Sequence, residues 1–211
     1  MKSIFTFLIL IAVATAATAQ DYAGLGMDVN AGPVPQGLKP GDKAPAFSGY
    51  DQSGARIQSG QLLENGPVIL FFYRGKWDPV CSKYLNNYQD SAKILTDMGV
   101  NFVAITPESI ENVEQTVRLH NITFTVIYDC QEQIMKDYGV FFSVTGDYCD
   151  MARKKFSIDI ARNNDRDAAH LPVPAAYIIN RQGVVVATWF DPDYNNRASV
   201  KWMIQNLASA L

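Results

Sequence analysis

Cysteine is scarce in this chain. Of 211 residues, only Cys81, Cys130 and Cys149 are cysteines. Three are too few to staple a domain together by disulfides, and an odd number leaves at least one thiol free or paired outside the chain. A free thiol is therefore a candidate reactive group.

Charge of either sign is also sparse. The chain has 18 Lys and Arg against 21 Asp and Glu, a net charge of −3, and no basic run occurs. This mild acidity disfavours nucleic acid and anionic membrane surfaces as partners, because both attract basic patches. There is no internal repeat or low-complexity tract, and the length suits one domain with a sizeable core.

Long apolar runs are missing as well. The only extended one, residues 4–13, is shorter than the roughly 20 residues that cross a bilayer. It follows Lys2 and precedes the small residues Ala17, Thr18 and Ala19, which is the pattern of a signal peptide over residues 1–19. We therefore expect an exported protein, periplasmic or secreted, with no other membrane association; an uncleaved anchor is the less favoured alternative.

The rest of the chain alternates between strand and helix patterns. Residues 20–38 are rich in Gly and Pro and predict an extended lead-in, followed by one domain over residues 39–211. Strands alternating with helices predict an α/β fold with a central sheet flanked by helices. Residues 139–170 interrupt the alternation and predict an irregular insertion. The predicted strands are 68–73, 100–105, 124–128, 175–179 and 184–189, and the predicted helices are 79–98, 108–119, 131–138 and 199–211.

Cys81 lies where a buried strand passes through a basic turn into the first turn of a helix. Helix N-terminal N–H groups and nearby cations favour a thiolate, so we expect Arg74 and Lys76 to lower the pKa of Cys81. The alternative is an inert cysteine filling an apolar gap. Asp78 followed by Pro79 suits a helix N-cap and first helical position.

Three separated motifs resemble peroxiredoxin-like proteins of the alkyl hydroperoxide reductase/thiol-specific antioxidant (AhpC/TSA) family. Y-R-G-K-W-D-P-V-C at residues 73–81 resembles the family's Y-R-G-x-W-C-P-x-C, residues 171–183 resemble its closing hairpin, and F-D-P-D-Y at residues 190–194, with Arg197 beyond, resembles its tail. The resemblance covers residues 38–211. It implies a thioredoxin-like, peroxiredoxin-type fold and an antioxidant oxidoreductase that acts on a peroxide or a protein thiol or disulfide, with an external reductant and no cofactor.

By this resemblance Cys81 is the peroxidatic cysteine, and Pro174 is the cis-proline that faces the thiol. Asp78 replaces the first cysteine of the motif, which excludes a disulfide cycle within it; Asp78 can accept a bond from peroxide, but its charge opposes a thiolate. The arginine that peroxiredoxins carry just before the hairpin strand is replaced by Pro174, and Arg74 is a candidate substitute.

The remaining cysteines are candidate resolving thiols. Cys149, in the insertion, is preferred over Cys130, and a structural Cys130–Cys149 disulfide is about equally plausible. His120 and His170 lack metal-ligand spacing with Asp78 or Cys81, so we expect no metal site. Two functions stay open: an exported thiol-dependent oxidoreductase that uses Cys81 alone, and a non-catalytic binding module with a degraded redox site.

Overall fold

A computed structural model describes residues 21–210 of the chain. The predicted signal peptide, residues 1–19, lies outside the described residues. Within the described part, no helix is both long enough and apolar enough to span a bilayer.

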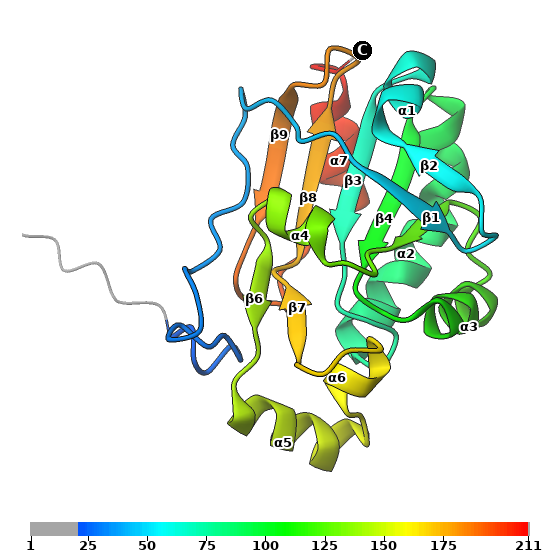
Figure 1. Ribbon diagram of the computed structural model, residues 1–211. Helices are drawn as coiled ribbons and strands as arrows, with labels where there is room; N and C mark the ends of the chain where they lie inside the picture. Colours follow the sequence, from blue (N-terminus) through cyan, green and yellow to red (C-terminus); the bar gives the residue numbers. More distant parts are fainter. Residues whose placement is uncertain (1–20, 211) are drawn as a thin grey trace, which may run out of the picture.

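A seven-stranded sheet carries the domain, in the order β2-β1-β5-β4-β3-β8-β9 (Figure 1). β3, β4 and β5 are parallel, whereas β1, β8 and β9 each run antiparallel to the strand they join. The sheet therefore has a parallel centre and antiparallel edges. Its strands are β1 (Ser48–Asp51), β2 (Arg56–Gln58), β3 (Val68–Phe72), β4 (Asn101–Thr106), β5 (Thr125–Tyr128), β8 (Ala175–Ile179) and β9 (Val185–Phe190).

Helices cover both faces of this sheet. α2, α3 and α7 cover one face, and α1 and α4 lie against the other (Figure 1). Their bounds are α1 (Ser59–Asn65), α2 (Pro79–Asp97), α3 (Ile110–His120), α4 (Gln133–Asp137) and α7 (Val200–Leu207). The expected α/β, thioredoxin-like arrangement is therefore confirmed.

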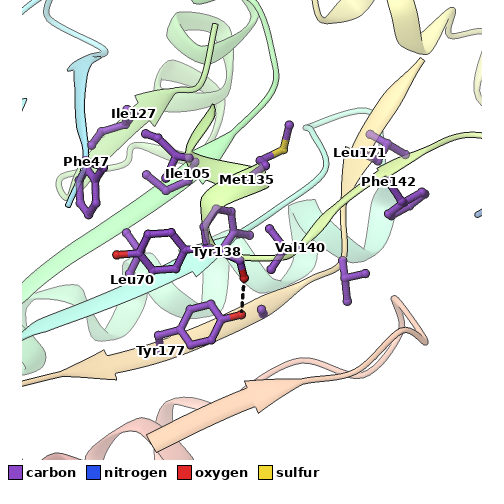
Figure 2. Close-up of a cluster of buried hydrophobic side chains, with 14 of the residues drawn as sticks. Phe47, Leu70, Ile105, Ile127, Met135, Tyr138, Val140, Phe142, Leu171 and Tyr177 are labelled. Carbon is purple, nitrogen blue, oxygen red and sulfur yellow. Dashed lines mark hydrogen bonds between the residues drawn. The ribbon is translucent and has the colours of Figure 1, made fainter. Parts of the chain in front are cut away.

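β3 has two buried faces, which explains its continuous apolar sequence. Leu70 points into the core beneath α4, where Tyr138 and Tyr177 pack beside it (Figure 2). Phe71 points the other way and contacts Tyr88 of α2, with ring centroids 4.8 Å apart. The strand that leads into the Cys81 turn is thus fixed from both sides.

The stretch predicted to be irregular, residues 139–170, is ordered. β6 (Phe141–Ser143) pairs with β7 (His170–Pro172), and α5 (Gly146–Phe156) and α6 (Ile160–Asn163) lie between them. Strands of three residues are too short to show a period, so the pattern concealed them. α5 begins at a Thr145 cap, whose hydroxyl accepts the Tyr148 N–H.

Two smaller expectations change at the chain ends. The lead-in is extended only in part: a turn precedes Met27, which is buried and bridges to Val144. The last helix ends at Leu207 rather than at residue 211, and Ile204 on it is exposed. Met203 and Leu207 are buried, as a helical period predicts.

Candidate active site at Cys81

The turn after β3 delivers Cys81 into the interior. Asp78 is the N-cap of α2, with its Oδ1 accepting the Val80 N–H at 2.9 Å, and Pro79 occupies the first helical position. The predicted capping role is therefore confirmed. Cys81 follows on the first turn and is 1% exposed. Local sequence alone explains this part of the geometry.

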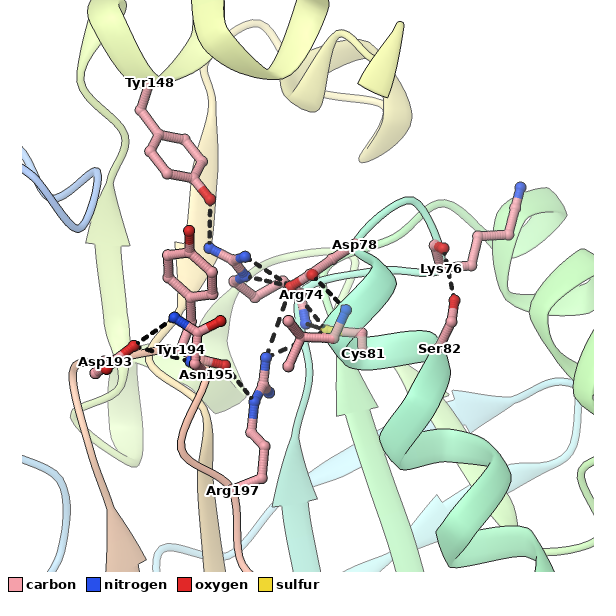
Figure 3. A network of polar contacts seen from close by, with 11 residues as sticks. Arg74, Lys76, Asp78, Cys81, Ser82, Tyr148, Asp193, Tyr194, Asn195 and Arg197 are labelled. Atoms are coloured by element: carbon pink, nitrogen blue, oxygen red, sulfur yellow. Dashed lines mark hydrogen bonds and ion pairs between the residues drawn. The ribbon is translucent and has the colours of Figure 1, made fainter. Parts of the chain in front are cut away.

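Three groups surround the Cys81 sulfur (Figure 3). The Arg74 backbone N–H and the Arg197 Nη2 each lie 3.4 Å from Sγ. The thiol donates to Asp78 Oδ2 over 3.3 Å. Sγ thus has two positively polarised neighbours and one carboxylate acceptor.

Asp78 binds both arginines as well as the thiol. Its Oδ2 lies 2.6 Å from Arg74 Nη2, 2.9 Å from Arg74 Nε and 3.6 Å from Arg197 Nη2. Arg74 also donates to the Tyr148 hydroxyl at 2.8 Å, and its guanidinium carbon lies 3.8 Å from the centroid of the Tyr194 ring. The buried Arg74 guanidinium is therefore held by the Asp78 carboxylate, the Tyr148 hydroxyl and the face of the Tyr194 ring.

These charges shift the pKa values of the site in opposite directions. Burial raises the pKa of Asp78, but the charge and hydrogen bonds of Arg74, with the charge of Arg197, more than offset it, so the net pKa is lowered. For Cys81, burial dominates and raises the pKa; Arg197 and Arg74 lower it and Asp78 raises it. The expectation of a lowered pKa of Cys81 is wrong for this conformation. With a neutral thiol, two guanidinium groups face one carboxylate, a surplus of one positive charge.

Lys76 does not reach Cys81, contrary to expectation. Its side chain points away from the sulfur (Figure 3), and its Nζ donates to Asn112 Oδ1 at 3.2 Å and Gln115 Oε1 at 2.8 Å. Both partners are on α3. The cation that the sequence placed beside the thiol therefore fastens the turn to a neighbouring helix.

Glu108 holds the same turn from beneath, a role that its predicted place at the start of a helix does not indicate. It is 1% exposed and accepts the Lys76 N–H at 3.1 Å, the Thr116 hydroxyl at 3.2 Å and the Asn163 amide at 3.4 Å. Burial raises its pKa. Gly75 is needed above it, with φ of +147° and space so tight that a Cβ would lie 2.9 Å from Glu108 Oε1.

Pro174 faces Cys81 as expected, but not through a cis bond. It precedes β8 and lines the same cavity of about 20 Å³ as Cys81. The described residues contain no cis peptide bond, so the cis prediction is wrong. The trans form is the more stable one for X–Pro bonds, by about 0.5–1 kcal/mol.

Arg197 takes the place that we considered for Arg74. The Arg74 guanidinium is committed to Asp78 and Tyr148, and only its backbone N–H reaches the sulfur. Arg197 instead comes from the segment before α7, anchored by its Nε donating to the Tyr194 carbonyl at 2.7 Å. The tail motif contained it, but nothing in the motif indicated that it contacts a cysteine 116 positions earlier.

The other two cysteines do not join the site. Both are free, so the Cys130–Cys149 disulfide is not formed; Cys130 is exposed after β5, and Cys149 is partly buried on α5. Burial raises the pKa of Cys149. The only polar partners of Cys81 Sγ among the described residues are Arg74, Asp78 and Arg197.

The two histidines lie on separate elements. His120 Nδ1 pairs with Asn86 Oδ1 at 2.7 Å, and His170 Nδ1 with Glu132 Oε1 at 2.8 Å. Within residues 21–210, no three His, Cys, Asp or Glu side chains gather into a metal site.

A strand, a tight turn and a helix that begins two residues before a buried cysteine, with a proline across the cavity, define a thiol protein of the thioredoxin-like class. The chain belongs to the AhpC/TSA family, whose sequence model matches residues 40–188. Its motif carries Asp78 in place of the first cysteine.

Individual relatives agree with this membership. A Mycobacterium tuberculosis protein provisionally named a peroxiredoxin is 27% identical over 125 residues, 59% of this chain and 81% of the relative. Escherichia coli peroxiredoxin Bcp is 27% identical over 104 residues, 49% of this chain and 66% of Bcp.

Solved structures support the fold. A peroxiredoxin-like protein from Aquifex aeolicus superposes with a TM-score of 0.64 at 17% identity, over 84% of this chain and 91% of the other. The M. tuberculosis peroxidoxin BcpB gives a TM-score of 0.60 at 20% identity, over 82% of this chain and 96% of the other. At these identities the likeness concerns the thioredoxin-like peroxiredoxin fold alone.

Proposed function

We propose that this protein is an exported thiol peroxidase that uses Cys81 as its only catalytic cysteine. The observation that carries the proposal is the pair of donors on Sγ, the Arg197 guanidinium and the Arg74 N–H, each at 3.4 Å. Both stabilise negative charge on sulfur, and the guanidinium also stabilises charge that develops on a departing peroxide oxygen. Membership of the AhpC/TSA family supports peroxide reduction by a thiol as the class of reaction.

The chemistry follows from one thiol and one peroxide. The Cys81 sulfur attacks the nearer peroxide oxygen; an S–O bond forms as the O–O bond breaks, and sulfur loses two electrons. The leaving oxygen takes the thiol proton and departs as water when the substrate is hydrogen peroxide, so that thiol plus peroxide gives sulfenic acid plus water.

Ionisation of the thiol balances the charge of the site. As the thiol loses its proton, the negative sulfur neutralises the surplus positive charge of Arg74 and Arg197 over Asp78. Asp78 keeps both guanidiniums near the sulfur through its contacts of 2.6 and 3.6 Å. Its own charge acts against the thiolate. Asp78 therefore positions the two arginines, but it also raises the pKa of Cys81.

Reduction back to the thiol requires a second thiol. An external thiol condenses with the sulfenic acid, releases water and forms a mixed disulfide; a further thiol then displaces Cys81 as a disulfide product leaves. This external resolution is supported by the free state of Cys130 and Cys149, neither of which is among the polar partners of the Cys81 sulfur. The signal-like segment of residues 1–19 supports reductants of the periplasm or the extracellular space.

The product of one oxidation tests this proposal. The purified, reduced protein is treated with one equivalent of hydrogen peroxide, trapped with a sulfenic-acid reagent and mapped by mass spectrometry. We expect a sulfenic acid at Cys81, equally in wild type and in Cys130→Ser and Cys149→Ser, and none in Cys81→Ser. A Cys81–Cys149 disulfide would contradict the single-cysteine cycle, and an unmodified Cys81 would contradict peroxidase function.

One observation favours the second candidate, a non-catalytic binding module. Burial raises the pKa of Cys81 and covers its sulfur almost completely. In that case Arg74 and Asp78 are a structural ion pair, and no peroxide or disulfide substrate turns over. Catalytic turnover by wild type with a small dithiol as reductant would refute this candidate.

A further inference from the structure

Tyr148 connects the stretch of residues 139–170 to the Cys81 site (Figure 3). It is buried on α5, and its hydroxyl accepts a hydrogen bond from Arg74 Nη1 at 2.8 Å. The other two nitrogens of the Arg74 guanidinium, Nε and Nη2, both donate to Asp78 Oδ2. Within the described part of the chain, Tyr148 is therefore the only acceptor for the third nitrogen, and this bond fixes the plane of the guanidinium.

Aromatic rings enclose the same guanidinium. Its carbon lies 3.8 Å from the ring centroid of Tyr194, 5.5 Å from that of Trp77 and 5.7 Å from that of Tyr148. Tyr148 and Tyr194 meet edge to face, with centroids 6.3 Å apart. Arg74 is 1% exposed, so water does not replace a lost partner easily. The orientation of Arg74 therefore depends on the side chains around it.

Two segments hold Tyr148 in place. The Thr145 hydroxyl accepts the Tyr148 N–H at 3.3 Å, and the Gly26 carbonyl accepts the Thr145 N–H at 3.0 Å. Gly26 also lies against the Tyr148 ring, where a Cβ would come within 2.6 Å of ring atoms. Burial raises the pKa of Tyr148 to about 12, so its hydroxyl is neutral at neutral pH. The lead-in and α5 together present a fixed, uncharged acceptor to Arg74.

Arg74 in turn acts on Cys81 through its charge. Burial raises the pKa of Cys81, whereas the charges of Arg197 and Arg74 lower it and that of Asp78 raises it. Arg74 is also the closer of the two cations that face Asp78 Oδ2, at 2.6 Å against 3.6 Å for Arg197. If the Arg74 guanidinium turned away, Cys81 would lose a favourable charge and would face a less neutralised carboxylate. Both changes disfavour a thiolate.

We propose that Tyr148 is a positioning residue for Cys81: its hydroxyl holds the Arg74 guanidinium against Asp78 and so keeps a positive charge beside the thiol. The reactivity of the cysteine on α2 is thus set in part by a residue of α5. For the rate of peroxide reduction, the inference rests on the proposed peroxidase function. For the acidity of the thiol, it stands independently of that function.

Tyr148→Phe tests the proposal, because it removes the hydroxyl and keeps the ring. The pKa of Cys81 is taken from the pH dependence of its alkylation, resolved by peptide mass spectrometry, and oxidation by hydrogen peroxide is timed at neutral pH. Urea unfolding establishes that each variant is folded. We expect the pKa of Cys81 to rise further and its oxidation to slow on the order of 10-fold, about the contribution of one hydrogen bond to a charged group.

The matched control is Tyr138→Phe. Tyr138 is also a buried tyrosine whose hydroxyl makes one hydrogen bond, to the Pro45 carbonyl at 3.0 Å, but it packs in the core beneath α4. Its loss should lower the unfolding free energy and leave both the pKa and the oxidation rate of Cys81 unchanged. A purely structural role for Tyr148 predicts the same result for the two variants.

The outcomes keep this proposal apart from the peroxidase function. A raised pKa of Cys81 in Tyr148→Phe alone supports the positioning role. An unchanged pKa in Tyr148→Phe, or an equal rise in Tyr138→Phe, would overturn it, even if wild-type Cys81 reacts rapidly with peroxide. If wild-type Cys81 reacts no faster than free cysteine while Tyr148→Phe still raises its pKa, the peroxidase function fails and the positioning of Arg74 stands.

Discussion

Two buried carboxylates flank the turn that carries Cys81, and their surroundings differ. Asp78 lies against two guanidinium groups and has a lowered pKa. Glu108 accepts hydrogen bonds from a backbone N–H, a hydroxyl and an amide, and burial raises its pKa. Both are almost fully buried, so burial does not explain the difference; the nearby cations do.

The two carboxylates therefore act in different ways, one through its charge and the other through the hydrogen bonds that it accepts. Asp78 carries a charge that holds Arg74 and Arg197 near the sulfur. Glu108 needs no charge for its work, because its oxygens act as acceptors that fix the turn to α3 and α6. Replacing each carboxylate by its neutral amide should therefore have very different consequences.

The largest expected effect comes from Asp78→Asn. Asparagine can still cap the N-terminus of α2, so any loss of stability in this variant reports on the carboxylate charge alone. Removing one partner of a buried ion pair costs about 3–5 kcal/mol of unfolding free energy. The same change removes the carboxylate beside the thiol, so the pKa of Cys81 should fall. Urea unfolding measures the first effect, and the pH dependence of thiol alkylation measures the second.

The control for this variant is Asp97→Asn, whose partner Lys93 lies 2.8 Å away on the exposed face of α2. An exposed pair is worth under about 1 kcal/mol. The Asp78 effect should also fade in acid: a lowered folded pKa gives stability above the ordinary value of 3.8 that is lost as the pH falls through the folded pKa. An equal loss from both variants would contradict the account.

Arg197→Met removes the guanidinium beside the sulfur while keeping a similar length. The pKa of Cys81 should rise further, since the charge of Arg197 lowers it in the wild type. Peroxide oxidation of Cys81 should slow at neutral pH. Arg153→Met on exposed α5 serves as the control, and Arg197→Lys should restore part of the rate. An unchanged rate in Arg197→Met would remove Arg197 from the site.

The effect of Glu108→Gln on stability should depend on pH. A carboxyl group whose folded pKa is raised stabilises the fold fully below its ordinary value of 4.5 and loses that contribution as the pH rises through the folded pKa. Between acid and neutral pH, the stability of the variant relative to wild type should therefore rise. Urea unfolding across this range measures it, with exposed Glu64→Gln as control; a flat difference would show that burial does not raise the pKa of Glu108.

Lys76→Ala should have the smallest effect. Its ammonium group is bound to Asn112 and Gln115, away from the sulfur, so the pKa and the oxidation rate of Cys81 should not change. Loss of these surface contacts should cost under about 1 kcal/mol. Alkylation of Cys81 over a range of pH values checks this, and a clear rise in its pKa would restore Lys76 to the role that the sequence indicated.

The sequence predicted the parts of this site that depend on neighbouring residues. A buried strand, a turn and a capped helix follow from residues 68–81 alone, because side-chain burial and capping are local signals. Arg197 and Tyr148 come from distant segments, and only the folded chain shows that both reach the Arg74–Asp78 pair. Glu108 was visible as an acid after a buried strand, but its three donors come from separate elements.

The central claim is that Cys81, held between Arg197 and Asp78, is a peroxide-reactive thiol. Its most direct test is the second-order rate constant for Cys81 oxidation by hydrogen peroxide at neutral pH in Cys130→Ser/Cys149→Ser protein. Aligned donors at a developing negative charge are worth on the order of 100-fold in rate, so we predict a constant at least that far above the value for free cysteine. A constant equal to or below that of free cysteine would contradict the claim and leave the binding module as the function.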